Sequence, residues 1–213
     1  MIEIKNKQTG EVIHCVDAES LEGQSFAGVK LMGADFSSLN LTGANFRNAD
    51  LRKADFTASQ LHRVSFYEAS LGGATLDDVV ATECDFTEAS LEGSHAHNAD
   101  FSRSVFRYAR LTQCDFTGSK MASADMSVAD LRGNLTKVDL YQADLRGSKL
   151  NGAILVSADM SKAKLDGANL LGADLTGAHY LPEQFHNARA TGVIGRRGQG
   201  PTKPKRAWWQ FWE

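Results

Sequence analysis

The 213-residue sequence lacks most features that mark membrane, secreted or disulfide-stapled proteins. It has no apolar run of the length that a membrane-spanning helix requires. Residues 1–5 lack the apolar segment of a secretory signal, so we expect a cytoplasmic protein. The three cysteines, Cys15, Cys84 and Cys114, lie far apart without CxxC spacing. This usage predicts reduced, buried thiols rather than a disulfide framework.

Groupings of residues that carry catalysis are missing as well. The sequence has no phosphate-binding glycine loop, no nucleophile elbow and no Cys/His pair. Among the six histidines, only His95 and His97 are close enough in sequence to suggest shared metal ligation, and we expect both to point outward. Because the sequence offers this pair no further ligand, we predict no metal site. No cofactor is expected either, and the sequence favours a non-enzymatic protein.

Charge is nearly balanced in total but uneven along the chain. The net charge of −3 gives no bulk electrostatic argument for direct nucleic-acid binding. Residues 21–180 carry a net charge of −5, and residues 181–213 carry +4. An acidic body is therefore followed by a basic tail.

The dominant feature that is present is a period of five. From Leu21 to Tyr180 a core-type residue, nearly always Leu or Phe, recurs at every fifth position, with one spacing of four between Leu131 and Leu135. A helix face repeats every 3.6 residues and a strand face every 2, so a period of five indicates a short strand plus a turn, repeated around a coil. We call these positions centres, and the predicted core centres include Phe26, Phe36, Phe46, Phe56, Phe66, Leu145 and Leu165.

Composition around each centre is regular too. The residue two before it is small, most often Ala; the residue before it is often Asp; and the residue two after it is often Gly. Small and large inward residues together fill a narrow interior. The recurrent Asp predicts a turn or surface role. Glycine supplies the positive φ that a type II turn needs at its third residue.

Units such as Ala34-Asp35-Phe36-Ser37-Ser38 and Ala143-Asp144-Leu145-Arg146-Gly147 resemble the A(D/N)LXX unit of the pentapeptide-repeat family. The resemblance covers residues 19–180. It implies an all-β fold, a right-handed quadrilateral β-helix with four units per coil and about 8 coils. In its repeat the chain also resembles the quinolone-resistance and topoisomerase-immunity members of the family, which are proposed to mimic duplex DNA toward DNA gyrase.

Five segments are expected along the chain. They are an N-terminal hairpin cap (1–18), a Phe-rich block (19–133), a Leu-rich block (134–180), a C-terminal cap with a short helical turn (181–194) and a basic flexible tail (195–213). All Phe centres up to Tyr180 lie in the Phe-rich block, so we expect the Leu-rich block to be slimmer and more deformable. The alanine centres Ala81 and Ala96 predict thin packing, and the four-residue spacing predicts a corner defect or slight kink.

Four units per coil divide the surface into faces that recur every 20 residues. One of them, here called the aspartate face, carries the centres Phe36, Phe56, Leu76, Ala96 and Phe116. Its outward residues include the predicted partner-binding set Asp35, Asp55, Asp77, Asp78 and Asp115. We expect no Lys or Arg on this face before Lys137, whereas the other faces mix both signs. Such a stripe is suited to a basic groove built for DNA phosphates.

Two hypotheses for function follow. In the first, the aspartate face binds DNA gyrase or another type II topoisomerase and protects it from inhibitors. In the second, the rod is a rigid scaffold or adaptor whose aromatic tail docks through Trp208, Trp209, Phe211 and Trp212. The tail itself leaves five alternatives open: a protein partner, a homodimer formed by the C-terminal region, weak contact with a membrane surface, folding back onto the rod, or a flexible tail that docks on nothing.

Overall fold

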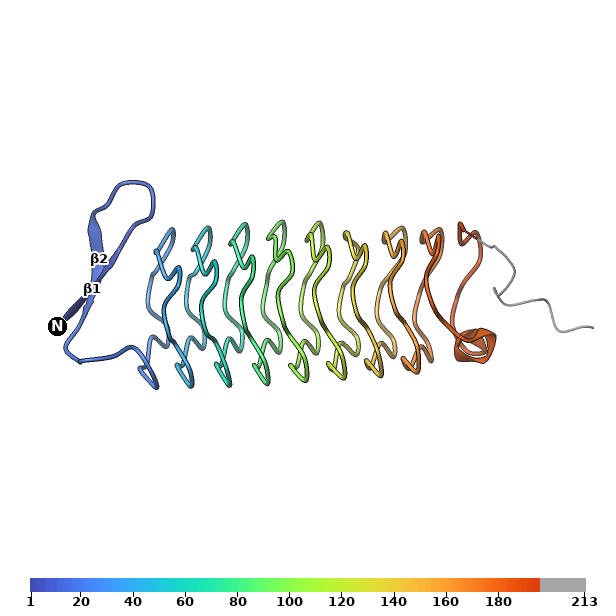
Figure 1. The fold of residues 1–213 in the computed structure, drawn as a ribbon, viewed down its shortest axis with the longest axis horizontal. Helices are drawn as coiled ribbons and strands as arrows, with labels where there is room; N and C mark the ends of the chain where they lie inside the picture. Colours follow the sequence, from blue (N-terminus) through green and yellow to red (C-terminus); the bar gives the residue numbers. More distant parts are fainter. Residues whose placement is uncertain (196–213) are drawn as a thin grey trace, which may run out of the picture.

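The computed structural model describes residues 1–195, which form one row of stacked coils with a hairpin at its N-terminal end (Figure 1). The named elements are few: β1 (Ile2–Lys5) pairs antiparallel with β2 (Val12–Val16), and a 3-10 helix, η1 (Pro182–Phe185), lies near the other end. Within this described part, no helix has the length and apolar character needed to cross a membrane.

Successive coils are joined by a ladder of parallel backbone bridges. Paired residues lie 20 apart, or 19 apart across the one short spacing, from Ser25 with Asn45 at the start to Asp174 with Ile194 at the end. Twenty residues are four five-residue units, so each coil has four sides. The amide of Phe26, for example, donates to the carbonyl of Asn45 at 2.7 Å. The ladder runs past Tyr180, so residues up to 194 continue the path of the coils.

A turn follows nearly every centre. The carbonyl of Phe26 accepts the amide three residues later at 3.0 Å, and the residue two after the centre has a positive φ. This holds for glycine (Gly28, 69°) and equally for other residues (Asn48, 56°; Val128, 60°). The stacked ladder therefore imposes the left-handed conformation, and glycine is favoured there without being required.

The aspartate before a centre is a turn residue. Its Oδ1 accepts the backbone N–H two residues on, at 2.8 Å from Thr57 to Asp55 and at 3.0 Å from Ser102 to Asp100. Asparagine does the same, since Asn45 accepts the amide of Arg47. These side-chain bonds satisfy amides that the ladder leaves free, which explains why Asp and Asn recur there.

The interior is a column of centres. The side chains of Phe26, Phe36, Phe46, Phe56, Phe66 and Leu145 are 0% exposed and that of Leu165 is 1% exposed. Phenylalanines one coil apart stack, with ring centroids 4.8 Å apart for Phe26 and Phe46 and 5.1 Å for Phe36 and Phe56. Rings on facing sides meet edge to face, as Phe46 and Phe56 do at 6.0 Å. The Phe-rich block thus has two aromatic ladders packed against each other.

At the two alanine centres, a buried serine hydroxyl takes the place of the backbone hydrogen bond of the turn. At Ala81 the turn bond is replaced by the Ser104 hydroxyl of the next coil, which donates to the Ala81 carbonyl at 2.7 Å and accepts the Cys84 amide at 2.9 Å. At Ala96 the Ser119 hydroxyl bridges the Ala96 carbonyl and the Ala99 amide in the same way. A hydroxyl enters the backbone turn where the side chain of the centre is short.

The four-residue spacing is a tightened corner. The Gly133 amide donates to the Leu131 carbonyl only two residues back, at 2.9 Å. Asp115 then pairs with Asn134, 19 residues on, and pairs 20 apart resume with Asn134 and Ile154. A Cβ on Gly133 would lie 2.5 Å from the carbonyl oxygen of Cys114, so only glycine fits this corner without a shift of backbone. The coils continue in one row across it (Figure 1).

The hairpin extends the backbone ladder at the N-terminal end. The Lys7 amide donates to the Gly33 carbonyl, and the Asp35 amide donates to the Lys5 carbonyl, both at 2.8 Å. Ile4 is buried, and the His14 ring meets Phe26 edge to face at 5.9 Å. Because strand residues alternate between faces, the neighbour of His14 points away. The prediction of three buried thiols is therefore wrong for Cys15, which is exposed, whereas Cys84 and Cys114 are buried.

Candidate functional site

The aspartate face is built from two straight columns of outward side chains. Bridges join successive residues one before the centre, so these residues stack directly above one another in the order Asp35, Asp55, Thr75, His95, Asp115 and Asn134. The residues one after each centre form the second column, Ser37, Thr57, Asp77, His97 and Thr117. The repeat thus places polar groups from many coils side by side without any loop.

A hairpin lysine lies on the N-terminal end of this face. Lys7 Nζ is 3.2 Å from Asp35 and 3.3 Å from Asp55. Burial tends to raise the pKa of both carboxyls, but hydrogen bonds from Ser37, Thr57 and Lys7 outweigh it and hold the pKa values below the usual range. Hydrogen bonds to Asp35 and Asp55 likewise raise the pKa of Lys7. The expectation of a stripe without cations is therefore wrong at this end.

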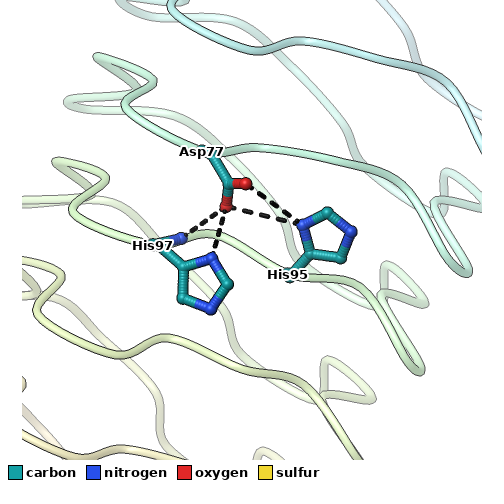
Figure 2. A group of neighbouring side chains, drawn as sticks. All are labelled: Asp77, His95 and His97. Atoms are coloured by element: carbon teal, nitrogen blue, oxygen red, sulfur yellow. Dashed lines mark hydrogen bonds and ion pairs between the residues drawn. The ribbon is translucent and has the colours of Figure 1, made fainter.

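The middle of the face holds a compact group of one aspartate and two histidines from adjacent coils (Figure 2). An Asp77 oxygen lies 3.0 Å from His97 Nδ1, and the other lies 3.3 Å from His95 Nδ1. The backbone amide of His97 also donates to Asp77, at 2.7 Å. The side chains of His95 and His97 are 45% and 43% exposed, so the group is open to solvent.

Asp115 lies on the other side of His97, with its Oδ2 3.5 Å from His97 Nε2. Burial tends to raise the pKa of Asp115, but hydrogen bonds from Thr117, Asn134 and His97 outweigh it, so the pKa is lowered. Asp78 is the exception on this face: it is exposed and makes no ion pair with any residue in 1–195.

The buried thiols offer no nucleophile. Burial raises the pKa of Cys84 to about 12 and that of Cys114 to about 11, so both remain protonated near neutral pH. Each donates to a backbone carbonyl of the preceding coil, Cys84 to Leu61 and Cys114 to Leu91. Each thiol is therefore a hydrogen-bond donor between coils; unlike the bridging serines, it adds to a backbone turn bond that is already made, Val64 to Leu61 and Ser94 to Leu91.

Two features of the aspartate face were not predicted from the sequence. The grouping of Asp77 with His95 and His97 had a signal, because a 20-residue period places position 77 beside position 97 on the next coil. The position of Lys7 on this face had no signal in the sequence, since the hairpin lies outside the repeat. The predicted docking residues Trp208, Trp209, Phe211 and Trp212 lie outside the described residues.

The C-terminal half of the rod exposes isolated apolar side chains. Ile154, Leu171, Leu181 and Ile194 are 42–58% exposed. Ile154 and Ile194 stand in the column of the aspartate face, separated by Asp174, whereas Leu171 is on a different side of the coil. These residues form no single continuous column.

Comparison with known proteins agrees with the repeat. The sequence model of the family described as Pentapeptide repeats matches in eight copies over residues 30–66, 59–95, 97–133 and 143–179. No curated protein sequence matches the chain significantly. Among solved structures, QnrB1, a plasmid-mediated fluoroquinolone resistance protein, is 20% identical with a TM-score of 0.60, over 80% of this chain and 88% of that one.

A second solved structure is HetL from the cyanobacterium Nostoc sp. strain PCC 7120, a pentapeptide repeat protein involved in the regulation of heterocyst differentiation. It is 28% identical over 81% of this chain and 83% of its own, with a TM-score of 0.37. The family match covers most of the rod, and the QnrB1 likeness shows the same fold. The chain belongs to the pentapeptide-repeat family and folds as its right-handed quadrilateral β-helix.

Proposed function

We propose that the protein is a non-enzymatic binding rod that docks on a type II topoisomerase such as DNA gyrase through its aspartate face and protects the enzyme from inhibitors. The observation that carries the proposal is the set of five aspartates on the aspartate face, held on one side of a continuous stack of coils, with Asp55 and Asp115 fixed by turn hydrogen bonds. Carboxylates fixed in this way present negative charge to a basic groove without further ordering of side chains.

The middle of the aspartate face offers the carboxylates best suited to binding a partner. Asp35 and Asp55 share one cation, Lys7, so half of their combined charge is balanced within the protein. Asp78 is exposed and unpaired within residues 1–195, and it lies beside Asp77, with Asp115 two coils along. The docking surface we propose is therefore centred on Asp77, Asp78 and Asp115.

The fold likeness supports the same function. QnrB1 is described as a plasmid-mediated fluoroquinolone resistance protein. A shared rod gives the two proteins a comparable way to present a charged face. At 20% identity the surface residues of QnrB1 cannot be transferred to this protein, so the proposal must be tested on the residues of this chain.

The experiment is gyrase supercoiling against titrated protein, with and without a fluoroquinolone. Asp78→Lys reverses the charge of the exposed carboxylate and leaves the turn bonds of Asp55 and Asp115 in place. Glu88→Lys is the matched control, because Glu88 occupies the same position after its centre, with φ of 60° against 55°, on a different face. A chain ending at residue 199 tests the aromatic tail.

Rescue of the drugged enzyme by the full chain and by Glu88→Lys, with loss of rescue by Asp78→Lys, is the expected result. Absence of rescue at protein well above the gyrase concentration would overturn the topoisomerase proposal. Partner binding that survives Asp78→Lys but is lost on removal of residues 200–213 would instead favour the scaffold function, with the tail as the docking element.

A further inference from the structure

We propose that Asp77, His95 and His97 form a binding site for a divalent transition metal ion of the zinc type. The site shares Asp77 and Asp115 with the docking surface proposed above, but its test measures metal binding alone and does not rest on topoisomerase binding. One ligand comes from one coil and two from the next, so a bound ion would join neighbouring coils on the surface of the rod (Figure 2).

The distances between the candidate ligand atoms suit a tetrahedral ion. Ligands at 2.0–2.1 Å from zinc lie roughly 3.3 Å from one another at tetrahedral angles. The Asp77 oxygens lie 3.0 Å from His97 Nδ1 and 3.3 Å from His95 Nδ1. All three ligand atoms lie within 4.8 Å of one another, so small rotations of the two imidazoles bring them around one ion. Without an ion, the same atoms contact one another as carboxylate and imidazole, and Asp77 also accepts the backbone amide of His97.

A second carboxylate sets up His97 as a ligand. Asp115 Oδ2 lies 3.5 Å from His97 Nε2, on the side of the ring opposite Asp77. A carboxylate that accepts Nε2–H keeps the proton on that nitrogen and leaves Nδ1 with its lone pair free for a metal. Asp115 is itself held by Thr117 and Asn134. This carboxylate–histidine–metal arrangement is typical of built metal sites.

The backbone holds the ligands in place. The His97 amide donates to Asp77 at 2.7 Å, which fixes the carboxylate against the next coil. Both histidines flank Ala96, whose turn is bridged by Ser119. Two imidazoles and one carboxylate leave a fourth position open toward solvent, where water completes the coordination. Nitrogen-rich ligand sets of this kind favour Zn²⁺, Co²⁺ or Ni²⁺ over Mg²⁺ or Ca²⁺.

The test is equilibrium binding of Zn²⁺ to untagged full-length protein, measured by calorimetry and by the visible spectrum of the Co²⁺ form. All proteins carry Cys15→Ser, which removes an exposed thiol as a competing zinc ligand. His95→Gln and His97→Gln remove one ligand each. The matched control is His62→Gln, which alters an imidazole on another face that is bonded to Thr82.

The expected result is saturable binding of one ion per chain, a tetrahedral Co²⁺ spectrum, and loss of both in His95→Gln and His97→Gln but not in His62→Gln. In Asp115→Asn the new amide oxygen can still accept the turn hydrogen bond, as the side chain of Asn134 does from the Thr136 amide. The loss of the carboxylate beside His97 should weaken Zn²⁺ binding about 10-fold to 100-fold. The proposal is overturned by an absence of saturable binding in folded protein, or by a loss in His62→Gln equal to that in His97→Gln.

A thermal measurement gives an independent readout. An ion that binds only the folded chain raises its melting temperature with concentration, because binding shifts the folding equilibrium by mass action. Zn²⁺ should therefore raise the melting temperature of the parent and of His62→Gln while leaving His97→Gln unchanged. An equal rise in His97→Gln would show that zinc acts elsewhere and would contradict the site.

Discussion

The two blocks of the rod share one backbone and differ in what fills it. In the Phe-rich block, rings stack at 4.6–5.3 Å from coil to coil and meet edge to face across the interior. Between Leu135 and Leu175 the centres are Leu and Met, all at most 2% exposed. The ladder of bridges is the same in both. The coil is therefore set by backbone bonding, and the side chains decide how much apolar contact each coil gains.

The blocks differ equally in their turns. At the position two after the centre, the Phe-rich block has fifteen non-glycine residues and seven glycines with positive φ, and the Leu-rich block has four and five. A non-glycine residue in this conformation is strained by roughly 1–2 kcal/mol. We infer that the larger aromatic core offsets the greater turn strain of the Phe-rich block.

The largest expected effect comes from truncating the aromatic core. Phe46 contacts four other phenylalanine rings, and Phe46→Ala should lower the free energy of unfolding by about 3–5 kcal/mol. Leu165→Ala, on the same side of the coil in the Leu-rich block, should cost about 2–4 kcal/mol. Urea unfolding of both variants measures the difference.

Repeat proteins do not always unfold in one step, so hydrogen exchange should accompany the urea experiment. Amides of coils next to Phe46 should lose protection in Phe46→Ala, while those of the Leu-rich block retain theirs. An equal or larger cost for Leu165→Ala would break the comparison, since the ring ladders would then add nothing beyond the burial of a leucine.

The joint between the blocks is expected to be nearly as sensitive. In Gly133→Ala the new Cβ meets the Cys114 carbonyl oxygen at 2.5 Å, and the corner must open. Overpacking of this kind costs about 1–3 kcal/mol. Gly72→Ala is the control, because its Cβ would meet nothing closer than 3.6 Å and its φ is not in the left-handed region. Thermal unfolding of both variants checks the prediction; equal melting temperatures would contradict it.

Much of this fold could be predicted from the sequence, because every coil repeats the same local physics. The five-residue period, the small residue before Phe36 and the aspartate beside it all act within one unit and its neighbours. Even the exception at Leu131–Leu135 was visible as a missing residue. Local rules repeated many times leave little for tertiary context to override.

What could not be predicted depends on contacts that the period does not describe. Lys7 reaches the aspartate face from a hairpin with its own register, so its pairing with Asp35 and Asp55 has no sequence signal. Cys15 is exposed because of strand alternation in that same hairpin. The serine bridge at Ala81 depends on a hydroxyl 23 residues away meeting an opened turn.

Two buried serines, Ser104 and Ser59, are predicted to affect stability in opposite directions when replaced by alanine, and by less than the changes above. Ser104→Ala removes the hydroxyl between the Ala81 carbonyl and the Cys84 amide, and should cost about 1–2 kcal/mol because both groups lose a buried partner. Ser59 is also fully buried, but its hydroxyl has no partner among the described residues. Ser59→Ala should therefore raise stability by up to about 1 kcal/mol.

Urea unfolding of the two serine variants under the same conditions measures the contrast. Both substitutions remove one hydroxyl from the Phe-rich block and leave its rings unchanged. Equal destabilisation would show that the bridge at Ala81 contributes nothing, and that the turn there closes with an ordinary backbone bond once the hydroxyl is gone.

The smallest expected effect tests the account of turn strain. Val128 is a β-branched residue with φ of 60°, and Gly147 occupies the equivalent position on the next coil, in the Leu-rich block. Val128→Gly should raise the free energy of unfolding by up to about 1 kcal/mol, because the relief of about 1–2 kcal/mol of strain exceeds the roughly 0.5–1 kcal/mol of chain entropy that glycine adds to the unfolded state. For a chain of this length, that corresponds to a rise of about 2–4 °C in melting temperature.

Val156→Gly is the matched control for Val128→Gly. Val156 is half-buried and follows its centre directly, where φ is not positive. Glycine there adds chain entropy to the unfolded state and relieves no strain, so it should lower the free energy of unfolding by about 0.5–1 kcal/mol. If both substitutions destabilise alike, the positive φ of the Phe-rich block carries no strain. The difference between the two blocks would then lie in their cores alone.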